Sequence, residues 1–137
     1  MAKRKLRILI VEDDPVSQRL IQGILSPFGY CDISPNGEEA VKSFFQMSLE
    51  NNKSYDLICM DIMMPELDGQ QAMRQIREIE KSKGLEDTEG VHIIMVTALD
   101  DPKNVIKAFK DHGAIGYVTK PVTKEKLLGE IRSLGLI

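Results

Sequence analysis

The chain alternates between short apolar runs and longer segments whose apolar residues recur at helical spacing. The apolar runs lie at residues 6–11, 30–34, 57–60, 91–96 and 116–119. The run 91–96 is apolar at nearly every position, as expected of a strand that helices cover on both faces. Strands that alternate with helices predict a parallel sheet with right-handed crossovers. We therefore expect a three-layer α/β fold with helices on both sides of the sheet.

The predicted helices carry their own boundary signals. Asp14-Pro15 places a capping residue before a proline at the first helical position, and Asp101-Pro102 repeats this device. Gly29 is expected to end the first helix, and Thr123 can cap the last one. The residues expected to face inward are Val16, Leu20, Ile21, Ile24, Leu25 and Phe28, then Ala40, Val41, Phe44 and Phe45, then Ala72, Met73, Ile76 and Ile79, then Val105, Ile106 and Phe109, and finally Leu127, Leu128, Ile131 and Leu134. The polar stretch 81–90 predicts a surface loop.

Composition limits the classes of function. The 137 residues predict one domain, residues 1–137, with the 42% hydrophobic and 28% charged content of an ordinary globular protein. Because the net charge is −3, we expect no direct binding to nucleic acid. No apolar stretch approaches the roughly 20 residues that span a bilayer, and the charged N-terminus lacks the apolar core of a secretory signal. We therefore expect a cytoplasmic protein without membrane contacts.

Polar side chains follow the predicted strands at the points where the strands end. Glu12, Asp13 and Asp14 follow the first strand, Asp61 the third, Thr97 the fourth and Lys120 the fifth. Open parallel sheets bind ligands beyond the carboxyl ends of their strands, and the first and third strands flank that crevice in the flavodoxin-like order 2-1-3-4-5. We therefore expect these side chains to converge.

The converging groups suit metal-assisted phosphoryl transfer. Carboxylates brought together repel one another unless a cation lies among them, and Mg²⁺ typically takes one or two protein carboxylates, here Asp13 and Asp61. An aspartate can also attack phosphorus and form an acyl phosphate. Lys120 and the Thr97 hydroxyl would then hold the transferred oxygens. Asp14 is either a neighbour of this site or a helix cap.

Four short motifs, separated along the chain, occur in a fixed order. They are Ile8-Leu9-Ile10-Val11-Glu12-Asp13-Asp14-Pro15, then Asp61-Ile62-Met63-Met64-Pro65-Glu66-Leu67-Asp68-Gly69, then Thr97-Ala98, and finally Lys120-Pro121. With them the chain resembles the receiver domains of two-component response regulators over nearly its whole length. The resemblance implies a flavodoxin-like (βα)5 fold. It also implies that the protein is a phosphorylation switch and not a conventional enzyme, because it would catalyse only its own phosphorylation and dephosphorylation.

The resemblance assigns a role to each matching acid. Asp61 would accept a phosphoryl group from a histidine kinase or a small phosphodonor. Asp13 would bind Mg²⁺ directly and Glu12 through water, and the backbone carbonyl of Met63 would be a further ligand.

The resemblance also implies a switching mechanism. Thr97 would be the switch hydroxyl and Lys120 the phosphate-binding lysine, aimed by a cis bond to Pro121. Phosphate would draw Thr97 inward, and Tyr117 would turn into the vacated space and remodel the surface of the fourth helix, fifth strand and fifth helix. Bulky Met63 and Leu99, beside the path of the hydrolytic water, imply self-dephosphorylation over many minutes rather than seconds.

Three other functions share part of this sequence pattern. A phosphohydrolase of the haloacid dehalogenase type needs a second acid two residues after its nucleophile, where this chain has Met63. A flavodoxin would need a phosphate cradle of hydroxyls, glycines and amides where the acidic Glu12-Asp13-Asp14 stands. A degenerate receiver that only binds proteins would not require every phosphorylation residue to be present.

The expected partners follow from the resemblance. Upstream we expect a sensor histidine kinase or a histidine phosphotransfer protein, and downstream a protein target. No output domain follows the predicted fifth helix, so the expectation is a stand-alone receiver, either a monomer or a dimer formed on phosphorylation. The sequence identifies neither the kinase nor the target.

Overall fold

The sheet has the strand order that the sequence predicts. The computed structural model describes residues 5–50, 54–62, 68–85, 90–98 and 102–137. Its elements are β1 (Leu6–Val11), α1 (Pro15–Leu25), the 3-10 turn η1 (Ser26–Phe28), β2 (Gly29–Ser34), α2 (Gly37–Glu50), β3 (Leu57–Asp61), α3 (Gly69–Ser82), β4 (His92–Thr97), α4 (Pro102–His112), β5 (Gly116–Thr119) and α5 (Lys124–Ser133). The strands are parallel and lie in the order β2-β1-β3-β4-β5. This is the flavodoxin-like arrangement.

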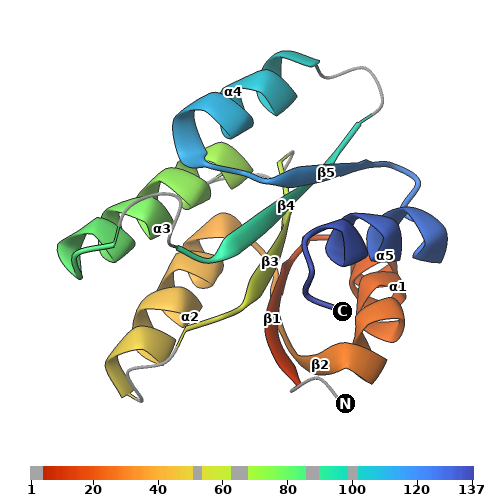
Figure 1. Ribbon diagram of the computed structural model, residues 1–137, viewed down its shortest axis with the longest axis horizontal. Helices are drawn as coiled ribbons and strands as arrows, with labels where there is room; N and C mark the ends of the chain where they lie inside the picture. The colour runs from red at the N-terminus through yellow and green to blue at the C-terminus, as the bar shows by residue number, and fades with distance from the viewer. Residues whose placement is uncertain (1–4, 51–53, 63–67, 86–89, 99–101) are drawn as a thin grey trace.

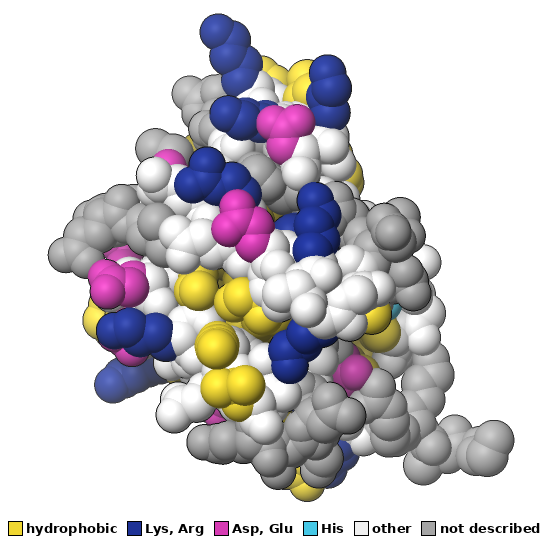
Figure 2. Space-filling model, turned by 90° about the vertical axis from the view of Figure 1, so that its left-hand side faces the viewer, with side chains coloured by type: hydrophobic (Ala, Val, Ile, Leu, Met, Phe, Trp, Pro, Cys, Tyr) yellow, Lys and Arg dark blue, Asp and Glu magenta, His cyan; other side chains and the backbone are white. Residues whose placement is uncertain are grey.

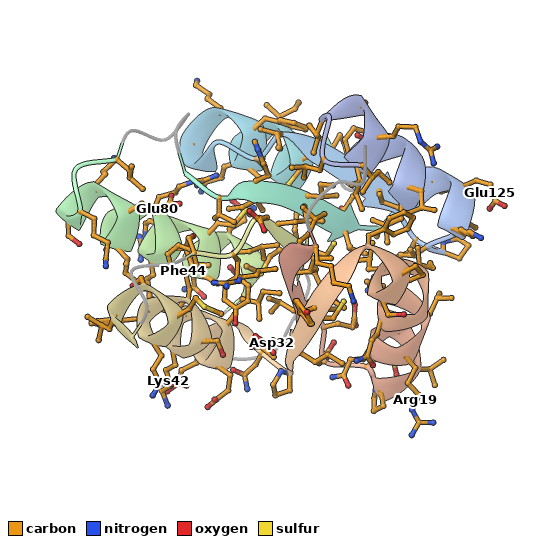
Figure 3. All side chains as sticks on the ribbon, turned by 60° about the horizontal axis from the view of Figure 1, so that its bottom comes forward. Arg19, Asp32, Lys42, Phe44, Glu80 and Glu125 are labelled. Carbon is orange, nitrogen blue, oxygen red and sulfur yellow. The ribbon has the colours of Figure 1, made fainter. Side chains whose placement is uncertain are left out.

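Helices cover both faces of the sheet (Figure 1): α1 and α5 lie on one face, and α2, α3 and α4 lie on the other. Because successive side chains of a strand point to opposite faces, β1 serves two cores. Ile8 and Ile10 pack beneath α1 and α5, whereas Leu9 and Val11 pack beneath the other three helices. Figure 3 shows the outer surfaces, with Arg19 of α1 and Lys42 of α2 pointing away from the sheet.

Side-chain caps fix where three helices begin. The Asp14 carboxylate accepts a hydrogen bond from the backbone N–H of Ser17 at 3.0 Å, so Asp14 is a helix cap. Asp68 forms a capping box with Gln71 at the start of α3, and Thr123 caps α5 as predicted. In the part of the chain that the structure describes, no helix is long and apolar enough to cross a membrane.

Two predicted boundaries are wrong by a few residues. The first helix ends at Leu25 rather than at Gly29, and a 3-10 turn bridges the gap. Pro27 has no backbone N–H to donate and cannot continue the helical ladder. The stretch 81–90 was predicted to be a loop, but α3 continues to Ser82, the second residue of that stretch.

Several apolar residues that were expected to face inward are exposed. The exposed fractions are 74% for Val16, 45% for Leu20, 41% for Phe45, 65% for Ile106 and 39% for Phe109. The apolar residues do recur at helical spacing, but α1, α2 and α4 pack on the rest of the fold along a stripe narrower than their apolar faces. The remainder of that face lies on the protein surface.

A buried ion pair joins α3 to the loops at the amino ends of β4 and β5. The Arg77 Nη1 atom donates to Glu80 Oε1 at 2.6 Å, and Arg77 Nη2 donates to the carbonyls of Val91 at 2.9 Å and Gly113 at 3.2 Å. Glu80 Oε2 accepts from the backbone N–H of Val91 at 2.6 Å. These bonds satisfy charges that are almost fully removed from water.

Removing one partner of this pair should be costly. We expect Arg77→Ala to lower the free energy of unfolding by about 3–5 kcal/mol, because Glu80 would be left as an uncompensated buried charge. Arg74→Ala, on the exposed face of the same helix, should change it by at most about 0.5 kcal/mol. Urea denaturation of both variants measures the difference; equal stabilities would contradict the assigned role of Arg77.

Candidate functional site

Three carboxylates converge at the carboxyl edge of the sheet, as the sequence predicts. Oxygen atoms of Glu12, Asp13 and Asp61 lie within 4.8 Å of one another. The cause is strand register: Val11 of β1 pairs with Met60 of β3, so the residues that follow them emerge side by side. The Glu12 backbone N–H also donates to the Ser34 carbonyl at 3.1 Å, which anchors the turn after β1.

The carboxylates differ in their contact with water. Glu12 and Asp61 are each 1% exposed, whereas Asp13 is exposed. Burial raises the pKa of Glu12 to about 7, and the negative charge of Asp61 adds to the rise. Glu12 Oε1 accepts a hydrogen bond from the Asp14 N–H at 3.2 Å, but the buried Oε2 has no hydrogen-bond partner among the described residues. A buried carboxylate of this kind is stabilised by binding either a proton or a cation.

Lys120 supplies one positive charge. Its Nζ atom lies 3.2 Å from Asp61 Oδ2, and it reaches the site from the residue after β5. The Lys120-Pro121 peptide bond is cis, as expected. Burial lowers the pKa of Lys120, but the carboxylates of Asp61 and Glu12 outweigh this and raise it, so the ammonium stays charged. One lysine does not balance three carboxylates.

The oxygen atoms of the site suit a hard divalent cation. Mg²⁺ prefers carboxylate oxygens and keeps water or phosphate oxygens in its remaining positions. Glu12, Asp13 and Asp61 could hold such an ion, and the orphaned Glu12 Oε2 fits this reading. Met63, whose carbonyl was expected to be a further ligand, lies outside the described residues, as does Leu99.

Thr97 and Tyr117 lie near this edge in different environments. Thr97 ends β4 and is 1% exposed, and its hydroxyl donates to the Ala98 carbonyl at 3.4 Å, a long and weak bond. Tyr117 in β5 is 44% exposed, and its ring meets that of Phe109 edge-on, with the centroids 6.2 Å apart. In this state, then, Tyr117 packs outward against α4.

Two supporting residues were not assigned to the site from the sequence. The Gln18 side chain donates to the Glu12 carbonyl at 2.7 Å and so holds the acidic turn. A Cβ atom on Gly69 would lie 2.5 Å from the Asp61 carbonyl oxygen, so only glycine allows α3 to approach the end of β3 this closely. The glycine that ends the second motif was the signal for this contact, whereas nothing in the sequence marked Gln18.

Comparison with known proteins places these features in a family. Residues 8–132 match the response regulator receiver domain. The chain is similar to the chemotaxis protein CheY of Halobacterium salinarum, with 36% identity over 96% of this chain and 95% of that protein. It is also similar to the two-component response regulator ARR22 of Arabidopsis thaliana, with 34% identity over 96% of this chain and 85% of that protein. Two further curated relatives, a probable transcriptional regulator of Cyanidium caldarium and the regulator RpaA of Synechocystis, are longer, and the chain spans about half their length.

The solved structures agree with this placement. The receiver domain of the histidine kinase CKI1 from Arabidopsis thaliana, crystallised with Mg²⁺ and BeF₃⁻, has a TM-score of 0.78 and 27% identity. The alignment covers 95% of this chain and 89% of that one. A family match over most of the chain, similar relatives of its own length, and an acidic triad at the carboxyl edge of a flavodoxin-like sheet lead to one conclusion. The chain belongs to the response regulator receiver domain family.

Proposed function

We propose that Asp61 accepts a phosphoryl group, with Mg²⁺ held by Glu12, Asp13 and Asp61. Receiver domains are phosphorylation-regulated switches that interact with histidine kinases, and the donor here would be such a kinase, a histidine phosphotransfer protein or a small phosphodonor. The observation that carries the proposal is the meeting of the three carboxylates within 4.8 Å, with Lys120 3.2 Å from Asp61. The remaining site roles are those that the resemblance to receiver domains implies.

The residues divide the work of phosphoryl transfer. When bound, Mg²⁺ neutralises developing negative charge on the phosphoryl oxygens. An Asp61 carboxylate oxygen attacks phosphorus and forms a P–O bond, while the bond from phosphorus to the donor's nitrogen or oxygen breaks and its electron pair stays on that donor atom. Lys120 then moves from Asp61 to a phosphoryl oxygen, and the weakly held Thr97 hydroxyl turns to donate to another. The Met63 carbonyl completes the proposed ligand set.

The same movements would produce the output. As Thr97 turns toward the phosphoryl group, Tyr117 leaves Phe109 and rotates inward, which changes the surface made by α4, β5 and α5. A downstream protein target would read this surface. Action as a single domain of residues 1–137 in the cytoplasm, without nucleic acid or membrane contacts, and as a monomer or a phosphorylation-dependent dimer, stays a prediction.

Phosphorylation of Asp61 can be tested directly. Incubation with acetyl phosphate and Mg²⁺ should add one phosphoryl group to the intact protein, and Asp61→Asn should abolish the adduct because an amide is a poor nucleophile. Asp68→Asn, a substitution at a helix cap, should leave the adduct in place. Intact mass spectrometry is the measurement. If Asp61→Asn gained the same phosphoryl mass as the unaltered chain, Asp61 would not be the phosphorylated residue. If the unaltered chain gained no mass, a degenerate receiver that only binds proteins would be favoured.

The raised pKa of Glu12 predicts pH-dependent metal binding. The pKa of about 7 in the folded chain exceeds the usual 4.5, so the ion-free protein binds an extra proton that Mg²⁺ must displace. Stability without Mg²⁺ should therefore fall as pH rises through this interval. Mg²⁺ affinity, measured by calorimetry, should be about tenfold higher at pH 8 than at pH 6. Glu12→Gln should flatten this dependence, and equal affinities for the unaltered chain would contradict it.

The switch can be separated from phosphorylation. With beryllofluoride and Mg²⁺, amide NMR signals of Tyr117 and Phe109 should shift in the unaltered chain. Thr97→Ala should keep the acetyl phosphate adduct on Asp61 but lose most of these shifts, because the hydroxyl that couples phosphate to the aromatic pair is gone. Ser133→Ala, at the far end of α5, serves as the control. Unchanged shifts in Thr97→Ala would remove Thr97 from the switch.

A further inference from the structure

One residue of α1 holds both ends of the acidic turn that follows β1. Gln18 Nε2 donates to the Glu12 carbonyl at 2.7 Å, and the backbone N–H of Gln18 donates to the Asp14 carbonyl at 2.9 Å. Both distances are those of well-formed N–H···O hydrogen bonds. Asp13, which contributes an oxygen to the acidic triad, lies between the two carbonyls.

The Glu12 carbonyl is open to Gln18 because α1 begins too late to use it. An α-helical N–H donates to the carbonyl four residues earlier, and in α1 the bond from Gln18 reaches back only to Asp14. Glu12 is 1% exposed, so water has little access to its carbonyl. A buried carbonyl without a donor is costly, and the Gln18 side chain supplies that donor.

The direction of the Asp13 side chain depends on this bond. Asp13 is exposed, so packing does not fix its carboxylate. The peptide groups before and after Asp13 set its φ and ψ angles, because each group is planar. Gln18 holds the group before Asp13 through the Glu12 carbonyl. The group after Asp13 is held by a longer bond, in which the Asp14 N–H donates to Glu12 Oε1 at 3.2 Å.

We propose that Gln18 is a positioning residue for Mg²⁺ and that it acts by orienting Asp13. Its bond to the Glu12 carbonyl directs the Asp13 carboxylate toward the other two acids, so that the oxygens of all three lie within 4.8 Å. The inference rests on the proposed function, because it takes Glu12, Asp13 and Asp61 to hold the ion. Outer residues that orient metal ligands commonly affect metal affinity strongly.

Gln18 reaches the site from the face of the sheet opposite α2 and α3. Figure 2 looks onto the side that carries those two helices, where hydrophobic side chains gather and Phe45 and Leu49 of α2 line a groove with Ile79 of α3. α1 packs on the other face (Figure 1). A substitution at Gln18 should therefore leave the groove unchanged, so the signals of its residues can serve as an internal reference.

A substitution that removes only the donor tests the proposal. Gln18→Met keeps an unbranched side chain and the net charge but cannot donate to the Glu12 carbonyl. It should weaken Mg²⁺ binding, measured by calorimetry on the full chain, about tenfold. Gln22→Met makes the same exchange one turn further along α1 and should leave the affinity unchanged. Gln18→Ala also lacks the donor and suits a helix, so it should show the same loss.

Two further readouts separate positioning from a purely structural role. In acetyl phosphate reactions of Gln18→Met, the half-saturating Mg²⁺ concentration should rise about tenfold. The rate at saturating Mg²⁺ should stay close to that of the unaltered chain, because the bound ion itself then holds Asp13. In ¹⁵N-labelled, ion-free protein, Gln18→Met should shift the amide signals of Asp13 and Asp14, and the signals of Phe45 and Leu49 should not move. Thermal unfolding verifies that each variant is folded.

Several results would overturn the inference. Equal Mg²⁺ affinities for Gln18→Met and the unaltered chain would do so, as would an equal loss of affinity in Gln22→Met. A lower rate at saturating Mg²⁺ with an unchanged affinity would also contradict it, because the effect would then lie in the transfer step. If the unaltered chain bound no Mg²⁺, the proposed function would fail together with the inference. Normal Mg²⁺ binding by both the unaltered chain and Gln18→Met would count against the inference alone.

Discussion

The repulsion among Glu12, Asp13 and Asp61 is the constraint around which the chain is organised. Carboxylates held within 4.8 Å would separate if they were free to move, and Lys120 offsets only part of their charge. The parallel register of β1 and β3, buried on both faces, prevents that separation. The folded core therefore holds an electrostatically unfavourable arrangement, which the binding of a cation would relieve.

Residues outside the acidic triad hold the segments that carry it. Gly69 lets α3 approach the end of β3, and Gln18 fixes the acidic turn from α1. The Arg77–Glu80 pair tethers the loops at the other edge of the sheet, where it holds β4 and the α4–β5 connection. Apolar side chains of α2 and α4 lie exposed on the outer surface of the fold.

The sequence predicted more of the site than of the surface. Strand order, the Thr123 cap and the convergence of the three acids were predicted, because each depends on local signals or on sheet topology. The sequence left Asp14 open between a site neighbour and a helix cap, and its side chain caps α1. The inward orientation of Val16 and Ile106 was wrong, because helical periodicity gives the direction of an apolar face and not the width that its neighbours cover. The buried Arg77–Glu80 pair was missed, since charged residues on a helix ordinarily face water.

The sequence by itself determined the type of fold and which residues have the chemistry for phosphoryl transfer. Alternating strand and helix periods permit little else than a parallel sheet, and acids just beyond its strands meet at one edge. Only the tertiary structure decided how those residues behave. Burial raises the pKa of Glu12 to about 7, the packing of Tyr117 on Phe109 turns that ring outward, and the spacing of α2 and α3 leaves a groove. Each depends on distances between segments far apart in the chain, which local sequence patterns do not encode.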